Sequence, residues 1–544
     1  MRKHWMQIAA VWVLATVAPA AQAQDTSRKQ SVEIISAFRP VLKNAAKLPF
    51  QATPPAPDAG PVQLQYNIPV QQLYFNLQPL AFRPLALPVD STGAANNSNY
   101  VKLGYGTYNT PLAEAGLSVG DGRFTNVNLL ASHISQKGNL RLQRFSKTEL
   151  NGYVNSRIQK TELYGKVGYW QQTNFLYGPD PAFINTKDDS LRKPYSQFTV
   201  KVGGRNAFPT QFGASYNPNA TLSLFGDGRS NETNALLELP VDLRLGTNYT
   251  IHLTGVADLT SFTPDGGNRY SNNIFYLNPA VSIRSGRLRL RAGIRPTWDN
   301  GPARVLPDVL LEAPLSQADL LFTAGWVGHV RKNNYEYLAK QNPWINQPLS
   351  QFNTRITDVY AGLRGSVADK LNYRFQFGVT EMLQLPLFEN SVRPALFAIR
   401  REGKLQAFHT QAELGFVQQN QLQASAKLDW YSIFNQQDEP HAWHFIPLQV
   451  TGTLRWQPIK QLQVRGDLFG WQGAVARINP QGNSRRLPAV MDLNAGAEYS
   501  ITPRIGAWLQ FNNIFNNAYE RWYNYPVLGF QVIAGIRLTF DQKL

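Results

Sequence analysis

Apolar and polar residues alternate with a period of two along most of the chain after about residue 100. In one segment, Leu237, Leu239 and Val241 are apolar, and Glu238 and Asp242 lie between them. The same alternation recurs at 371–379, 421–430, 462–467 and 492–499. Because successive side chains of a strand point to opposite faces, each segment predicts a strand with one apolar and one polar face.

The lengths of these segments and of their connections indicate a membrane barrel. Many segments exceed the roughly 5 to 6 residues usual in soluble sheets and approach the roughly 9 to 11 residues of a strand that crosses a bilayer. Short links such as Gly246-Thr247 alternate with long polar loops, of which 327–353 and 381–404 are two of the longest. This asymmetry is typical of outer-membrane barrels, which have short periplasmic turns and long extracellular loops.

The pattern predicts 22 strands, and an even number is what a single-chain barrel requires. The predicted starts lie near residues 99, 112, 123, 145, 160, 194, 211, 231, 248, 272, 288, 305, 318, 354, 369, 404, 421, 446, 461, 489, 504 and 529. The alternation is weakest at 205–230 and 299–330, which widens the predicted range to 18–22 strands. We therefore predict an all-β fold, a large transmembrane antiparallel up-and-down β-barrel over residues 99–544.

The region before the barrel has two parts. Arg2 and Lys3 precede a short apolar run, and Ala21-Gln22-Ala23 is a cleavage site of small residues, so residues 1–23 are expected to be a secretory signal peptide. Ten prolines follow within 24–98. Because each proline removes a backbone donor, we expect this range to be an extended periplasmic or luminal segment rather than a sheet or long helix.

Composition and charge narrow the class of partner. The 544 residues include no cysteine, which excludes disulfide scaffolds and cysteine-ligated metal sites. The formal net charge of +17 would normally indicate nucleic acid or an anionic surface. Since an exported barrel does not meet nucleic acid, we expect no nucleic-acid partner. The basic surplus is instead expected to contact outer-membrane lipids and lipopolysaccharide.

The predicted luminal faces carry nearly balanced charges. The inward basic residues are Lys102, Lys166, Lys201, Arg244, Arg289, Arg291, Arg295, Arg374, Lys427, Arg455, Arg465 and Arg537. The inward acidic residues are Glu114, Glu162, Glu238, Asp242, Asp258, Glu413, Asp429, Asp467, Asp492 and Glu498. Arg289, Arg291 and Arg295 share one strand face. They form a basic ladder that either steers anions or pairs with neighbouring luminal acids.

Aromatic residues near the predicted strand ends are expected in belts at the level of the lipid headgroups, with packing inside the protein as the alternative. They are Trp170, Trp298, Trp430, Tyr431, Trp456, Trp471 and Tyr499.

The sequence lacks the common signatures of catalysis. It contains no H-E-x-x-H and no glycine-rich phosphate loop. His441 and His444 are close in sequence but have no carboxylate at a spacing that suggests a metal site, so we expect them at the surface. We predict a protein that is not an enzyme and that has no cofactor and no metal site.

The final segments resemble known outer-membrane proteins. Phe530, Val532, Ile536, Leu538 and Phe540 lie on one face of the last strand and resemble the terminal signal read by the barrel-assembly machinery. Upstream, the segment 509–519 (LQFNNIFNNAY) resembles the penultimate strand and loop entry of the TonB-dependent receptor family. The resemblance covers about 489–540 and implies a 22-stranded barrel.

The resemblance is incomplete at the other end of the chain. Receptors of this family carry a folded plug domain, which residues 24–98 are too short to supply. Val32, Glu33, Ile34 and Ile35 have a likeness to the short box that contacts TonB. We predict an outer-membrane protein of a Gram-negative-type bacterium that takes part in solute uptake or passage, with TonB or another envelope protein as partner. The alternative is a non-transporting structural or interaction subunit of an outer-membrane assembly.

Overall fold

The computed structural model describes residues 98–541 except for 121–123, 179–185, 316–319, 349, 369, 391–394, 419–420 and 480–481. The predicted signal peptide (1–23), all but the last residue of the predicted extension (24–98) and the TonB-box-like residues 32–35 lie outside the described residues. These three assignments stay predictions.

Most of the described residues lie in strands, and the bounds of the elements are as follows. The first half of the wall contains β1 (Ser98–Gly106), β2 (Thr110–Gly120), β3 (Thr125–Lys137), β4 (Arg144–Ile158), β5 (Thr161–Phe175), β6 (Arg192–Asn206), β7 (Ala214–Tyr216), β8 (Asn219–Gly226), β9 (Asn231–Leu245), β10 (Tyr249–Thr263), β11 (Tyr270–Ser285) and β12 (Leu288–Asp299). The second half contains β13 (Arg304–Pro314), β14 (Leu320–Arg331), β15 (Thr354–Val367), β16 (Leu371–Asn390), β17 (Phe397–Gln418), β18 (Leu422–Gln436), β19 (Leu448–Ile459), β20 (Leu462–Gln472), β23 (Val490–Ser500), β24 (Ile505–Asn512) and β27 (Gln531–Asp541). The loops contain η3 (Asp188–Leu191), α2 (Tyr335–Gln341), β21 (Val475–Arg477), β22 (Ser484–Arg486), β25 (Glu520–Trp522) and β26 (Tyr525–Pro526).

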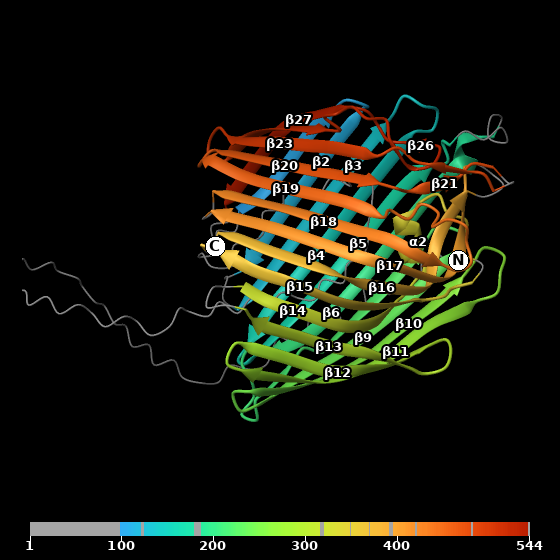
Figure 1. Ribbon diagram of the computed structural model, residues 1–544. Helices are drawn as coiled ribbons and strands as arrows, with labels where there is room; N and C mark the ends of the chain where they lie inside the picture. The colour runs from blue at the N-terminus through green and yellow to red at the C-terminus, as the bar shows by residue number, and fades with distance from the viewer. Residues whose placement is uncertain are drawn as a thin grey trace, which may run out of the picture. The chain divides into compact units, whose positions relative to one another are not determined.

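The wall closes on itself as an antiparallel barrel (Figure 1). Strand β1 pairs with β27, with Ser98 opposite Asp541 and Tyr105 opposite Ala534. β7 and β8 both pair with β9, and the break between them contains Pro218, which has no backbone donor. They form one crossing, so the 23 strands of the sheet give a barrel of 22. This confirms the predicted fold class and strand number, including the weakly patterned ranges.

The alternation of the sequence appears as two different surfaces of the wall. On β9, Leu237 and Leu239 are 43% and 46% exposed, and Glu238 between them faces the other side. Large apolar side chains are exposed in this way on strands throughout the wall. Such an outward apolar band is what a barrel surrounded by lipid requires.

The last strand follows the same rule. Four of the five predicted assembly-signal residues, Phe530, Ile536, Leu538 and Phe540, are exposed on the outer face, and Val532 is half-buried. Their recognition by the assembly machinery stays a prediction. Separately, no helix of the described ranges is long and apolar enough to span a bilayer.

The expected loop at 381–404 is wrong, because the two strands continue through it. Pairing of β16 with β17 extends to Asn390 opposite Phe397. At Gln384 the backbone has a φ of +62° and the ladder skips one residue on each strand, so the hairpin bends there. The part beyond the bend, 385–390 and 397–402, is the upper hairpin. Its apolar residues, such as Leu385 and Leu387, are buried, which explains why the strands continue past the wall.

Four members of the predicted aromatic belts have the outward position that a belt requires, and their place at the headgroups stays a prediction. Trp298, Trp430, Trp456 and Tyr499 are exposed on the outer face. The belt assignment is wrong for three residues, because Tyr431 and Trp471 are buried and Trp170 packs against an internal hydrophobic cluster.

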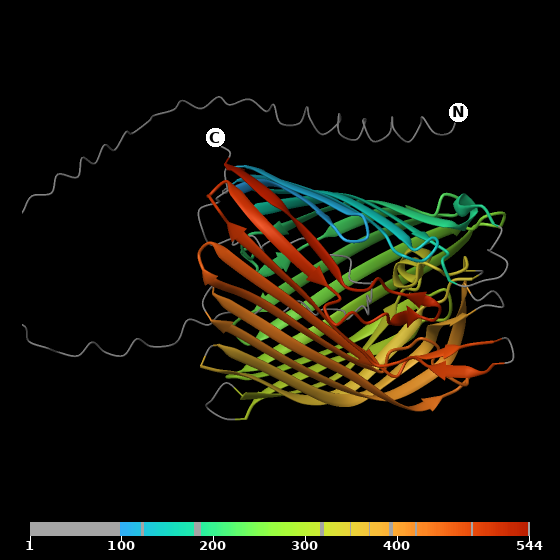
Figure 2. The ribbon, with the colours of Figure 1, turned by 90° about the horizontal axis from the view of Figure 1, so that it is seen from above.

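The two ends of the barrel differ. Short turns such as Gly246–Asn248 lie at the end where β1 begins and β27 ends, which we call the short-turn end. The opposite, long-loop end carries α2 and the small hairpins β21–β22 and β25–β26. Figures 1 and 2 both show α2, in yellow, at the end opposite to the C mark.

Candidate functional site

The long loops pack against one another at the long-loop end. We call this assembly the cap: the described residues of 332–348 with α2, 350–353, the upper hairpin, 437–447, 473–479, 482–489 and 513–530. Its main hydrophobic cluster draws on strand ends and loops from many parts of the wall: Leu142, Leu176, Leu191, Tyr195, Phe225, Phe262, Tyr335, Leu338, Ala339, Trp344, Ile345, Phe388, Phe397, Trp522 and Tyr525. Since these residues extend from the β3–β4 loop to β26, the cap joins widely separated parts of the wall (Figure 2).

Aromatic rings form the centre of the cap. Trp344 stacks on Tyr525 with ring centroids 3.9 Å apart, and Tyr177 meets both rings edge-on. The Trp344 indole N–H donates to the Phe175 carbonyl (2.9 Å), and the Tyr525 hydroxyl donates to the Ala395 carbonyl (2.5 Å). Buried aromatic side chains with satisfied polar atoms contribute strongly to stability, so this cluster holds three loops together.

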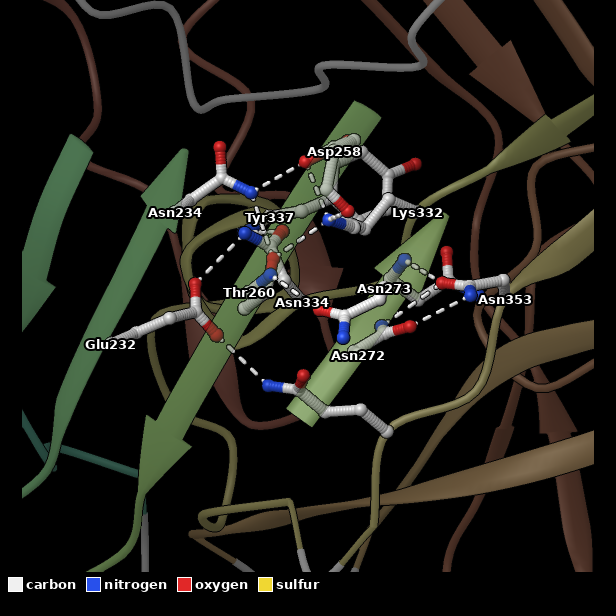
Figure 3. A network of polar contacts seen from close by, with 12 residues as sticks. Glu232, Asn234, Asp258, Thr260, Asn272, Asn273, Lys332, Asn334, Tyr337 and Asn353 are labelled. Carbon is white, nitrogen blue, oxygen red and sulfur yellow. Dashed lines mark hydrogen bonds and ion pairs between the residues drawn. The ribbon is translucent and has the colours of Figure 1, made fainter. Parts of the chain in front are cut away.

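A lysine anchors the start of the 332–353 segment to the wall (Figure 3). Lys332 Nζ, directly after β14, pairs with the Asp258 carboxylate on β10 (2.5 Å) and also donates to Thr260 Oγ1 (2.7 Å). Asn234 on β9 donates to the same Asp258 oxygen (2.7 Å). Burial lowers the pKa of Lys332, and Asp258 opposes that shift, so the pair keeps this lysine in place.

A buried glutamate holds the start of α2. Glu232, 2% exposed on β9, accepts hydrogen bonds from the Asn334 side chain (2.8 Å) and from the backbone N–H groups of Tyr335 (2.7 Å) and Glu336 (3.1 Å). Gln351, at the other end of the segment, donates to it as well (2.8 Å). Asn334 is also the N-cap of α2, because its side chain accepts from Tyr337 N (3.2 Å). One carboxylate thus fastens both ends of the segment.

Two further contacts complete this attachment. Asn272 on β11 and Asn353 exchange side-chain hydrogen bonds of 3.0 and 2.7 Å, and both are buried (Figure 3). On the other side of α2, Glu336 accepts from Gln197 Nε2 on β6 (2.7 Å) and Ser223 Oγ on β8 (2.9 Å). The helix is therefore held on the inner face of β6 to β11, several strands away from β14 and β15, where its segment starts and ends.

His444 links three other parts of the cap. Its Nδ1 lies 2.7 Å from the Phe388 carbonyl, its Nε2 accepts from Tyr523 N (3.3 Å), and its backbone N–H donates to the Val475 carbonyl (2.8 Å). The expectation of a surface position is wrong for His444, which is 1% exposed. Burial, with the nearby Arg521 charge, lowers the pKa of His444 to about 3. The ring is therefore neutral, with its proton on Nδ1.

Two buried glutamates fix the upper hairpin to neighbouring loops. Glu402 accepts from the backbone N–H groups of Gln437 and Asp438 (both 3.0 Å) and of Glu439 (2.9 Å). Glu389 pairs with Arg400 and with Arg477 of β21. Charge-assisted hydrogen bonds of this kind are roughly twice as strong as neutral ones. They are the reason that these loops have a defined path.

The predicted basic ladder lies among acidic partners. Arg289 lies 3.8 Å from Glu312 and Arg291 2.9 Å from Asp308. Arg295 donates to the Gly328 carbonyl (2.9 Å) and lies over the Tyr276 ring. The structure thus brings together two ion pairs and one carbonyl-bound arginine. Steering of anions by these residues stays a prediction.

Other luminal charges gather where the barrel closes. Lys102 on β1 lies 3.6 Å from Glu498 on β23, and Arg537 on β27 pairs with the same carboxylate. Lys102 also lies 4.4 Å from the centre of the Trp508 ring. The inner face therefore combines charges of both signs. Within the described ranges, no group of three or more His, Asp or Glu side chains is arranged to hold a metal ion.

The cap is not among the features predicted from the sequence, although the long loops contain a signal for it. Trp344, Trp443 and Trp522 all fall in segments that were expected to be polar loops, and all three are buried. A large aromatic side chain in a loop needs a packing partner. Three such loops at one end of a barrel indicate that the loops pack together.

Comparisons with known proteins identify the fold. No protein-family model and no curated protein match the chain. The solved structure of the FrpB iron transporter from Neisseria meningitidis is 10% identical, covers 82% of this chain and 81% of its own, and gives a TM-score of 0.62. The siderophore receptor PirA from Acinetobacter baumannii, at 8% identity, has the same coverage and TM-score. The pyoverdine receptor FpvA from Pseudomonas aeruginosa is 13% identical, with coverage of 81% and 78% and a TM-score of 0.60.

The chain therefore has the same barrel fold as these three solved structures. The likeness in the final segments therefore led to the correct fold. The apolar outer band agrees with a barrel embedded in a lipid bilayer, as the predicted outer-membrane location requires.

Proposed function

We propose that this barrel takes part in the passage of a solute across the outer membrane, and that the cap is its gate. The observation that carries the proposal is that the chain's own loops pack together at the long-loop end and are held by a few side chains such as Glu232 and Lys332. The wall has its backbone groups paired from strand to strand, whereas loops open at a lower free energy. The cap can therefore open while the barrel stays intact.

The character of the lumen supports a polar solute. Its charges of both signs occur as pairs, as at Arg291 with Asp308 and Lys102 with Glu498, so the lumen has no excess of one sign along these strands. The fold agrees with such a role, because the solved structures with this barrel include an iron transporter and siderophore receptors.

The partners follow from the same proposal. The outer face would contact membrane lipids and lipopolysaccharide, and the barrel-assembly machinery would read β27. TonB or another envelope protein would bind Val32–Ile35 and supply the energy to open the cap. Deletion of residues 32–35 tests this: uptake should stop while the amount of folded barrel in the membrane stays the same.

The packing of the cap favours a second candidate function. A cap with its own hydrophobic cluster of 15 buried residues is also suited to a permanently closed barrel. In that case the protein is a structural or interaction subunit of an outer-membrane assembly, with the long loops as its docking surface.

Conductance in planar bilayers separates the two functions. The full chain is expected to give few openings, and the cap-loosening variants Glu232→Gln and Trp344→Ala are expected to give frequent, solute-permeable ones. Asp265→Asn, a change at an exposed loop carboxylate, is the matched control and should behave as the unchanged protein. If the loosened variants remain closed and the barrel copurifies stoichiometrically with other envelope proteins, the interaction function replaces passage.

A further inference from the structure

The cap contains a small cavity, and the proposed role of the cap as a gate does not require it. The cavity lies between the end of β14, the upper hairpin, the 437–447 loop and β25, and its volume is about 60 Å³. A water molecule needs roughly 10 to 15 Å³ on this measure, so the space suits a small polyatomic ion. Its residues include Arg331, Arg521 and Trp522 together with the apolar Leu385 and Phe388.

The two arginines of this cavity lack charged partners. Arg331 is 8% exposed, and its Nη2 makes one long hydrogen bond, 3.4 Å, to Thr354 Oγ1. Arg521 donates through Nη1 to the His444 carbonyl (2.9 Å). The Nε atoms of both side chains are buried without a hydrogen-bond partner. In the part of the chain that the structure describes, neither guanidinium forms an ion pair with a carboxylate.

A third donor of this cavity also lacks an acceptor. Trp522 Nε1 is also buried without an acceptor, and the Arg521 guanidinium lies over the Trp522 ring at 4.2 Å. Two neighbouring side chains are already engaged elsewhere. Both His444 ring nitrogens are already engaged, and the Trp443 indole N–H donates to Glu439 (2.9 Å). The cavity thus combines two positive charges with three buried N–H donors that have no acceptor.

We propose that this cavity binds an oxyanion, a carboxylate or phosphate group of a small molecule, between Arg331 and Arg521. A guanidinium presents donors in a planar fork that fits two oxygens of such a group, and the Trp522 indole N–H supplies one more donor. The apolar side chains Leu385 and Phe388 limit water at the site, which strengthens the attraction between opposite charges.

The energetic balance agrees with a ligand. A buried charge without a partner is strongly unfavourable, and the contact with the Trp522 ring offsets only part of that cost. Burial lowers the pKa of Arg521 to about 9, which still leaves it charged at neutral pH. An anion in the cavity would satisfy all three donors and join β14, the upper hairpin and β25.

Titration of the purified full chain in detergent tests the site. Inorganic phosphate and acetate are added separately, with chloride at matched ionic strength as the reference, and binding is followed by calorimetry and by thermal stability. Saturable binding of phosphate or acetate is expected, with no effect of chloride. Comparison of the phosphate and acetate titrations shows whether the cavity prefers a tetrahedral or a planar oxyanion.

Three variants locate the binding. Arg331→Gln and Arg521→Gln should each weaken it by roughly 10- to 100-fold, the value of a hydrogen bond to a charged group. Trp522→Phe keeps the ring but removes the indole N–H, so it should weaken binding by a smaller factor. Arg229→Gln is the matched control, because Arg229 is exposed in a loop at the same end of the barrel.

Two results would overturn the proposal. One is the absence of saturable binding of either anion to the unchanged protein. The other is unaltered binding in Arg521→Gln and Trp522→Phe, provided that hydrogen exchange shows the cap still folded in both. The test measures binding alone, so its outcome does not depend on whether the barrel conducts.

Discussion

The wall and the cap are built by different rules. In the wall, the neighbours of each residue follow from register, and a slip of one residue would turn every apolar side chain from lipid to lumen. In the cap, each contact joins particular residues far apart in sequence, as Trp344 with Tyr525 or Glu232 with Tyr335. The wall therefore tolerates many sequences with the same alternation. The cap depends on individual side chains, so a single substitution can alter the cap and leave the barrel intact.

The largest expected effect comes from the centre of the cap. Trp344→Ala removes a ring that stacks on Tyr525 and should destabilise the cap by about 3 to 5 kcal/mol. Hydrogen exchange of residues 332–353 should accelerate, and the shift in gel mobility on heating, which reports the barrel, should not change. Trp344→Phe, which keeps an aromatic ring, is the control. Loss of the mobility shift would show that the cap and the wall are one cooperative unit.

A pair of substitutions on β9 tests the wall itself. Leu239→Arg places a charge on the lipid face, which costs about 2 to 4 kcal/mol near the bilayer midplane. Glu238→Arg introduces the same residue one position earlier, on the luminal face, and should cost much less. Unfolding in urea with lipid vesicles measures both. Equal costs would mean that the two faces of the wall are not separated as described.

A buried carboxylate gives the next effect. Glu232→Gln leaves an amide N–H₂ facing donors from Asn334, Tyr335 and Gln351, so the attachment of α2 should weaken by about 1.5 to 3 kcal/mol. Limited proteolysis within 332–353 should become faster. Asp265→Asn, at an exposed loop position, should leave the digestion pattern unchanged. An unchanged digestion pattern in Glu232→Gln would mean that the aromatic contacts alone stabilise this segment.

The smallest expected effect is that of pH on the cap. His444 has a pKa of about 3 in the folded cap and about 6.5 when exposed, so the opened cap binds a proton that the closed cap excludes. The stability that the closed cap gains from a neutral His444 is fully present above pH 6.5 and is lost as the pH falls toward 3. At pH 5.5 the loss is about 1.4 kcal/mol.

Hydrogen exchange of 437–447 between pH 7 and 5, corrected for the intrinsic rate, measures this loss. His444→Asn should remove the pH dependence, and His441→Asn should retain it. A dependence that persists in His444→Asn would assign it to another group.

The difference between wall and cap also explains what the sequence could predict. Alternation at Leu237 to Val241 is a local signal, so strand positions and the even strand number followed from it. The last strand, with Phe530 to Phe540 on one face, added the likeness that indicates the barrel class. The upper hairpin was missed because Leu385 and Leu387 are buried on account of distant loops rather than of their own alternation. His444 and Arg521 come together only after the 437–447 and 513–530 loops have folded, and no spacing in the sequence indicates that contact.

The pairing of β1 with β27 has a consequence for how the protein is made. Every other wall strand finds its partner in a neighbouring hairpin, but this contact joins the two ends of the whole barrel. Until β27 is in place, β1 and β24 each present an unpaired edge to which another chain can add. A chain that is cut short before residue 531 is therefore expected to aggregate or be degraded, however well its earlier hairpins have formed. Pairing of the final strand with β1 is thus the step that completes assembly of the barrel.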